Sequence, residues 1–409
     1  MIKLNTLYPC KIHLLKDILA VLLISSIFSS ALFYNRAEAG ILLFGIIGAV
    51  LSYNMRAFRQ DKNGQIILVL QLIFAVSVLL TGYEILGRTL VGSSHTIEFF
   101  GSLTGFSFLG FFSYHFWKKT NGTRFVFPIF SILCVILLIY SMTYGGRVYD
   151  LTGRYVITLG LPLCIFSLTF LGLLKPEARL HVNGAIFFNT TTLFVVTLGI
   201  ASRTQTIALL ISWVCAAVVL KHPVRAKLAY FLIPALFCGA YFLANSQNFD
   251  GIVSKRFSSL YEMVFATTQI ANISPDDSPT SDSSINTRLS LLKLGIDTSR
   301  EYFFFGAGNL AEGQFIKEHV GNYANFHNQF LSFIVQGGIV HLIAGICYIV
   351  APLIVTLKSA DQIQRKAIIL PSLFLVSLLP FTSYHNLGGM AHLHILFSWL
   401  IFALASEQD

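Results

Sequence analysis

The fold is decided by residues 285–338, which read INTRLSLLKLGIDTSREYFFFGAGNLAEGQFIKEHVGNYANFHNQFLSFIVQGG. The first part of this stretch predicts an amphipathic helix that carries Arg288, and a glycine turn follows at residues 306–308. The stretch ends with His327 and Asn328 at the start of a long apolar run. Ionisable groups that a mostly apolar chain keeps beside a membrane usually mark its function. We therefore expect the functional site in this stretch.

The chain of 409 residues is unusually apolar, with 55% hydrophobic and 11% charged residues and a mean hydropathy of +0.71. Soluble domains carry about 25% charged residues. Over this length the deficit predicts an all-α polytopic membrane protein. The net charge of +9 comes from short basic clusters between apolar runs, as in cytoplasmic loops, so it does not indicate nucleic-acid binding. The six cysteines have no metal-ligand spacing and predict no disulfide framework.

Twelve apolar stretches are predicted as spans, since a transmembrane helix needs about 20 apolar residues. They cover residues 15–33, 40–53, 65–81, 97–116, 126–144, 155–174, 182–200, 206–220, 229–244, 339–357, 367–379 and 391–405. Basic residues gather at the N-terminus and in the loops after the even-numbered spans. The positive-inside rule therefore places both termini in the cytoplasm.

With this orientation, the chain is predicted to have three parts. Residues 1–244 hold spans one to nine, residues 245–326 form a large periplasmic loop with amphipathic helices, and residues 327–409 hold spans ten to twelve. Within the loop, residues 252–265 fit a helix on the membrane surface, and residues 274–284, SPDDSPTSDSS, predict a flexible linker. The helix after the linker has Arg288 beside a predicted apolar stripe. That stripe consists of Ile285, Leu289, Leu292 and Ile296.

Arginines lie on the external side, which the positive-inside rule makes poor in them. Arg203 lies in ASRTQT between the seventh and eighth spans, Arg288 lies in the loop helix, and Arg147 and Arg154 flank a short external loop. Guanidinium groups bind phosphate oxygens through two parallel hydrogen bonds. A lipid-linked pyrophosphate at the outer interface would be such a ligand. Each arginine alone also fits a side chain that reaches lipid headgroups, but Arg203 and Arg288 together with His327 favour a phosphate site.

His327 is a candidate general base. A helix N-terminus disfavours imidazolium, so a histidine there is expected to be neutral and able to accept a proton near pH 7. The alternative, a capping or packing histidine, is our interpretation of His341, His385, His392 and His394. No short external loop carries an acidic pair that would hold a divalent metal beside a sugar phosphate, so no metal and no cofactor are predicted.

Three motifs resemble the bacterial O-antigen ligases, within the broader group of O-antigen ligases and polymerases. They are SRTQT with Arg203, NTRLSLLKLGI with Arg288, and HNQFLSFIVQGGI with His327 and Asn328. The resemblance implies the type C membrane glycosyltransferase architecture, with the large loop between spans nine and ten. It also implies transfer of O-antigen from undecaprenyl pyrophosphate to lipid A-core on the periplasmic side of the inner membrane, without a metal and with inversion.

The resemblance also implies roles for these residues. Arg203 and Arg288 would bind and neutralise the pyrophosphate, and His327 would deprotonate the acceptor hydroxyl, with Asn328 orienting it. Two further candidates for substrate binding, in the short external loop, are Arg147 and Arg154. The alternatives are an O-antigen polymerase, which uses the same donor, a protein O-oligosaccharyltransferase, and a flippase or permease for lipid-linked sugar. Spans almost without charged residues count against an ion-coupled transporter.

Overall fold

The computed structural model describes residues 7–33, 45–48, 50, 55–82, 93–120, 122–144, 283–308, 311–321, 325–357, 362–379 and 391–406, with short pieces between 165 and 218. These residues form helices joined by turns, and no strand occurs among them. The all-α prediction is therefore confirmed for this part of the chain. The predicted membrane-surface helix at 252–265 and the linker at 274–282 lie outside the described residues.

The helices are α1 (Leu7–Phe33), α3 (Met55–Gln60), α4 (Lys62–Gly82), α5 (Ser93–Thr120), η2 (Gly122–Phe125), α6 (Val126–Tyr144), α12 (Ser283–Glu301), α13 (Ala311–His319), α14 (Gln329–Ile349), α15 (Ala351–Thr356), α16 (Gln362–Leu378) and α17 (Ala391–Ser406). The helices α1, α4, α5 and α17 enclose the first, third, fourth and twelfth predicted spans, and α6 has the bounds predicted for the fifth. The sixth to ninth predicted spans lie mostly outside the described residues, so the number twelve stays a prediction.

Two helices of the described part are long and apolar enough to cross a membrane. They are α4, over Lys62–Leu79, and α14, over Gln329–Ile349, and shorter apolar helices lie at Val126–Ile136 and His394–Ser406. The outward face of α4 is itself apolar, because Ile66, Val69, Ile73 and Val76 are all exposed. These four positions recur at helical spacing and form one stripe. An apolar stripe on the outside of a bundle is typical of contact with lipid.

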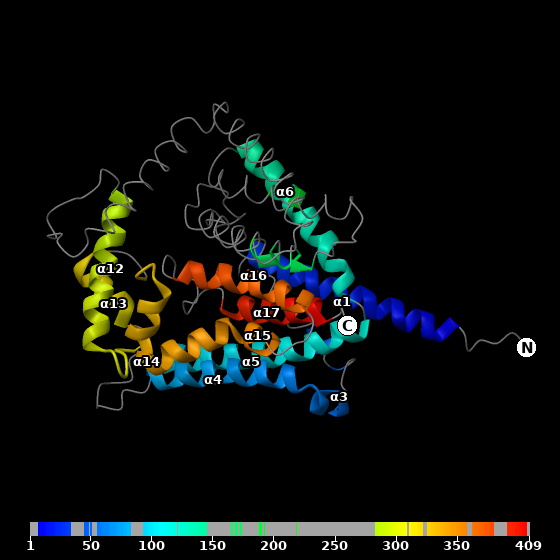
Figure 1. The fold of residues 1–409 in the computed structure, drawn as a ribbon, viewed down its shortest axis with the longest axis horizontal. Coiled ribbons are helices and arrows are strands. Elements are labelled where there is room, and N and C mark those ends of the chain that lie inside the picture. The colour runs from blue at the N-terminus through cyan, green and yellow to red at the C-terminus, as the bar shows by residue number, and fades with distance from the viewer. Residues whose placement is uncertain are drawn as a thin grey trace, which may run out of the picture.

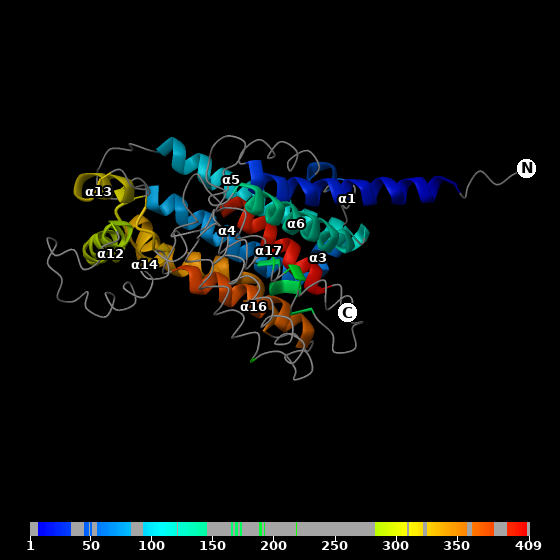
Figure 2. The ribbon, with the colours of Figure 1, turned by 90° about the horizontal axis from the view of Figure 1, so that it is seen from above.

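The helices form a bundle, with the polar helices α12 and α13 at one end of it (Figures 1 and 2). Helix α4 packs against both α5 and α14, and α17 packs against α5. Figure 1 shows α12 running across one end of the bundle, with α13 beside it. The start of α1 and the end of α17 lie toward the opposite end. The α12–α13 part of the predicted loop and these two helix ends therefore lie at opposite ends of the bundle, as the predicted orientation requires.

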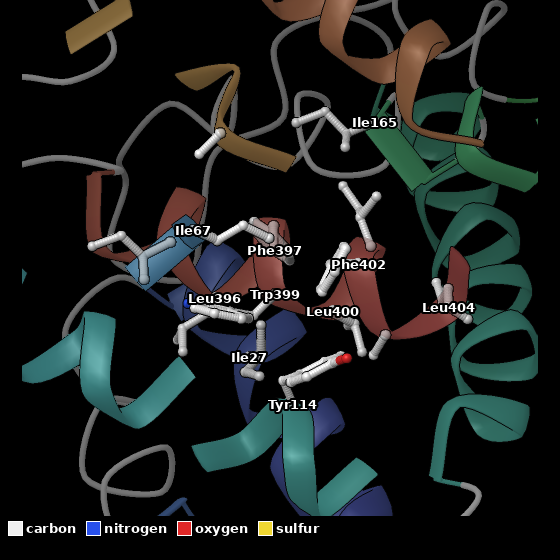
Figure 3. Close-up of a cluster of buried hydrophobic side chains, with 14 of the residues drawn as sticks. Ile27, Ile67, Tyr114, Ile165, Leu396, Phe397, Trp399, Leu400, Phe402 and Leu404 are labelled. Carbon is white, nitrogen blue, oxygen red and sulfur yellow. The ribbon is translucent and has the colours of Figure 1, made fainter. Parts of the chain in front are cut away.

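Aromatic side chains fill the centre of the bundle (Figure 3). Trp399 of α17 lies 5.6 Å from the ring of Tyr114 and donates a hydrogen bond of 2.9 Å from Nε1 to Oε1 of Gln71 on α4. Gly110 of α5 makes room for the indole, because a Cβ at that position would overlap it. The buried Trp399 therefore ties α17 to α4 and α5.

Helix α14 differs from the predicted tenth span, which was expected to begin at residue 339. It begins at Gln329, because Asn328 caps it by accepting a hydrogen bond of 3.1 Å at Oδ1 from the Leu331 N–H. It is then kinked at Gly337 and Gly338, where Gly338 has φ +69° and ψ −165°. The prediction placed the capped first half in the membrane part of the chain but outside the span, since its polar residues interrupt the apolar run.

The kink is the point where the turn after α12 docks on α14. Ile339 N donates to Phe303 O at 2.8 Å, and Gly308 N donates to Gln336 O at 3.0 Å. A Cβ at Gly338 would overlap the carbonyl oxygen of Phe304, and one at Gly306 would overlap the backbone of Gly337. The predicted glycine turn and the glycine pair of α14 thus cross each other backbone to backbone.

Replacing Gly338 with alanine is expected to lower the free energy of unfolding by about 2 kcal/mol or more, because its backbone conformation is essentially restricted to glycine. Thermal unfolding in detergent measures this loss. The matched control is Gly313→Ala in α13, where a Cβ would meet nothing within 4 Å. That variant is expected to match or exceed the wild type by roughly 0.5–1 kcal/mol. Equal melting temperatures for the two variants would contradict the role of the kink.

Candidate functional site

Helix α12 positions Arg288 through a face that differs from the predicted stripe. The fully buried position is Leu291, which packs in a cluster with Phe326 and Leu331. Gly295 lies one turn further along, and a Cβ there would press on Leu331 and Phe326. Arg288 precedes Leu291 by one helical turn, so it lies on this inward face and is half-buried. The predicted stripe lies beside this face, and its Leu292 and Ile296 are partly buried against the same cluster.

His327 lies between two anchored neighbours, just before α14. Phe326 is buried, and the His327 N–H donates to Oδ1 of Asn325 at 3.1 Å. His327 itself has φ +54°, a left-handed conformation that non-glycine residues rarely adopt. Such a conformation needs support from its surroundings, and it is common at functional sites. The backbone of the segment therefore fixes where the imidazole lies.

Arg288 and His327 influence each other electrostatically. Burial lowers the pKa of His327 to about 4, and the positive charge of Arg288 contributes to the same shift. The imidazole is therefore neutral at pH 7, and the causes of the shift are burial and the charge of Arg288. The structure thus brings together two candidates that are far apart in the sequence.

Asn328 serves as the N-cap of α14. Its Oδ1 accepts the Leu331 N–H, so only its Nδ2 could donate to a substrate while the cap is intact. The other candidates, Arg203, Arg147 and Arg154, lie outside the described residues. Their placement beside Arg288 stays a prediction.

The buried carboxyl of Glu312 holds this site together. Its Oε1 accepts from the Phe326 N–H at 2.8 Å and from Oγ of Ser332 at 2.7 Å, and its Oε2 accepts from Nε2 of Gln336 at 2.8 Å. The side chain is 2% exposed, and burial raises its pKa while the three hydrogen bonds oppose that change. Glu312 thereby links α13 to the residue before His327 and to the first half of α14.

Glu312 was not among the site residues predicted from the sequence. Its signal is spacing: Glu312 stands three and four residues before Phe315 and Ile316, the apolar residues of α13. A carboxylate on the apolar face of a short helix is expected to be buried, and a buried carboxylate needs donors. This pattern could have identified it.

Replacing Glu312 with leucine is expected to lower the free energy of unfolding by roughly 2–5 kcal/mol, since it leaves buried donors without an acceptor at about 1–3 kcal/mol each. The melting temperature in detergent is the readout. Glu318→Leu is the matched control, because Glu318 is exposed on the same helix. It is expected to change stability by no more than about 0.5 kcal/mol. A loss of stability in Glu312→Leu of no more than about 0.5 kcal/mol would argue against the role of Glu312 in holding the site together.

Two of the histidines interpreted as packing residues have side chains that the structure describes, and both are buried in the bundle. His341 contacts Oγ of Ser77 through Nδ1 at 2.8 Å and stacks on Phe74. His394 lies 3.3 Å from Oγ of Ser398 and against Tyr348. Within the ranges that the structure describes, no three His, Cys, Asp or Glu side chains group as metal ligands would.

The described part of the chain is an all-helical bundle with apolar outer faces. The polar helices α12 and α13 lie across one end of it, and the ionisable site with its arginine–histidine pair lies at this end. Residues 188–346 match the family model described as O-antigen ligase. This part of the chain is similar to that family, in agreement with the resemblance carried by the three motifs. No curated protein matches the chain.

The matched region contains most of the candidate site. It includes Arg203, Arg288, His327 and the kink of α14, whereas Arg147 and Arg154 precede it. The family is membrane-embedded, and its members are glycosyltransferase-like O-antigen ligases or polymerases, so the match supports an enzyme role in general.

Proposed function

We propose that this protein is an O-antigen ligase. It would transfer the polysaccharide from undecaprenyl pyrophosphate to lipid A-core, at a site on the periplasmic side of the bacterial inner membrane. The observation that carries the proposal is the pairing of Arg288 with a neutral, half-buried His327 inside the matched region. Arg288 is suited to binding a pyrophosphate, and His327 is suited to accepting the proton of a hydroxyl.

The proposed reaction is a single displacement at the anomeric carbon of the donor. The acceptor hydroxyl oxygen forms the new glycosidic bond while the bond from that carbon to the pyrophosphate oxygen breaks, with inversion. Nε2 or Nδ1 of His327 takes the hydroxyl proton, and the pyrophosphate leaves with the bonding electron pair. Catalysis then depends on stabilising the charge that develops on the leaving oxygen.

Arg288 is proposed to stabilise that leaving group, with Arg203 as its partner. Two guanidinium groups can balance much of the pyrophosphate charge and hold it in one orientation. Arg147 and Arg154 are proposed as further contacts to the donor. The cap made by Asn328 would keep His327 oriented, and its Nδ2 would be available to the acceptor.

The test is transfer by the purified protein in detergent with EDTA present. Lipid A-core and undecaprenyl-pyrophosphate glycan are supplied, and the wild type is compared with His327→Ala. Glycan on lipid A-core from the wild type alone supports a metal-independent ligase. Longer lipid-linked glycan without modified lipid A-core would make the protein a polymerase. Donor binding with no transfer to either acceptor would favour a flippase or permease.

A further inference from the structure

Three consecutive phenylalanines lie exposed in the turn that follows α12. Phe303, Phe304 and Phe305 are 40%, 68% and 80% exposed. Burying one such side chain contributes about 1.5–3 kcal/mol, so exposing three to water is unfavourable. An exposed apolar group of this kind indicates a contact with a partner or a lipid.

The exposure does not come from a loosely held loop. Gly306 N donates to Tyr302 O at 2.9 Å, Ala307 N donates to Val335 O at 2.6 Å, and Gly308 N donates to Gln336 O at 3.0 Å. The turn is also pressed against the glycine pair of α14. The rings are therefore held outward by a backbone that is fixed at both ends.

The attachment point sets the level of the phenylalanines along α14. Phe303 O accepts the N–H of Ile339, the first residue after the kink. Val340 and Ile343 are exposed apolar residues of α14 directly after that point. The phenylalanine turn thus lies where the exposed apolar part of a candidate membrane-spanning helix begins.

We propose that Phe303, Phe304 and Phe305 insert into the acyl-chain region of the bilayer leaflet on the α12–α13 side. The occupant of this surface is the bilayer itself, because the surface continues into the outward face of α14 beyond the kink. Helix α12, which runs across the end of the bundle in Figure 1, would then be anchored at its C-terminal end. Arg288 lies roughly 20 Å back along the same helix and would be held at the membrane surface by this anchor.

The experiment introduces a fluorescent reporter by Phe305→Trp in the full-length protein, reconstituted in phosphatidylcholine–phosphatidylglycerol vesicles without donor or acceptor. The wild-type spectrum, from three native tryptophans, is subtracted. The added emission is expected to be shifted to the blue and mostly lost when the lipid chains are brominated, with little loss to aqueous iodide. Glu318→Trp, on the exposed side of α13, is the matched control and is expected to be quenched by iodide only.

Several outcomes would overturn the proposal. Red-shifted emission from Phe305→Trp, quenched by iodide as in the control, would place the turn in water. Emission that is shielded from both quenchers would indicate a protein contact, such as a second copy of this chain. Shielding that arises only on addition of a polyprenyl pyrophosphate would assign the surface to the isoprenoid tail of the donor. None of these readouts needs transfer activity, so the proposed function and this proposal can fail separately.

Discussion

Replacement of His327 by alanine is expected to slow glycan transfer by about 10²- to 10⁴-fold, the usual contribution of a general base. The imidazole lies between Phe326, which Glu312 anchors, and the capping residue Asn328, so alanine removes the ring while these backbone contacts remain. Initial rates with lipid A-core as acceptor measure the loss, and unchanged melting shows that the fold is intact.

His319→Ala is the matched control for this variant. His319 is exposed on α13, where its Nδ1 lies 2.8 Å from Phe315 O. Its removal is expected to leave the transfer rate near that of the wild type. If His327→Ala retained most of its activity at normal expression and stability, the proton would have to be taken by another group or by water.

The pH dependence of transfer should report on the same histidine. Burial and Arg288 lower the pKa of His327 to about 4, so its neutral, proton-accepting form predominates above that pH in the free protein. Pyrophosphate bound at Arg288 would offset the neighbouring positive charge and raise this pKa. The acid limb of kcat is therefore expected at a higher pH than that of kcat/KM. The pH profile of the residual activity of His327→Ala shows how ionisation of the donor itself affects the rate. Acid limbs of kcat and kcat/KM at the same pH would contradict the coupling between His327 and the bound pyrophosphate.

The helices of the bundle could be predicted because their information is local. A run such as Val126–Tyr144 is apolar throughout, so its bounds follow from the length a span requires. Helix α14 shows where this reasoning fails. Its first half contains Gln329, Ser332 and Gln336, which are polar, and these are buried against α13 or the bundle. Ser332 and Gln336 hydrogen-bond to Glu312 of α13, a partner that an apolar run cannot reveal.

The site could be predicted in part for the same reason. Arg288 and His327 stand out as ionisable residues in recognisable motifs, but their electrostatic contact depends on how α12 packs on α14. That packing involves Gly295 and Leu291, together with Leu292 and Ile296 of the predicted stripe, and the close approach at Gly295 could not be predicted from an apolar pattern. Glu312 was missed because its importance lies in three hydrogen bonds to groups 14, 20 and 24 residues away.

Replacement of Arg288 is the second change expected to have a large effect. Arg288→Ala is expected to slow transfer by about 10²- to 10³-fold, as for removal of a group that stabilises developing negative charge. Arg288→Lys keeps the positive charge but cannot make two parallel hydrogen bonds to a phosphate. A charge-assisted hydrogen bond contributes about 1.5–3 kcal/mol, so the lysine variant is expected to lose roughly 10-fold or more. Transfer rates and donor KM measure both effects.

Arg300→Lys provides the matched control on the same helix. The Arg300 side chain is 79% exposed and lies 3.8 Å from Asp297, an arrangement that contributes little to stability. This variant is expected to transfer glycan at the wild-type rate. Full activity in Arg288→Lys would show that charge alone is sufficient at that position. Because lysine also preserves the electrostatic effect on His327, a loss in Arg288→Lys with an unchanged acid limb would assign Arg288 to the geometry of the leaving group and not to tuning of the base.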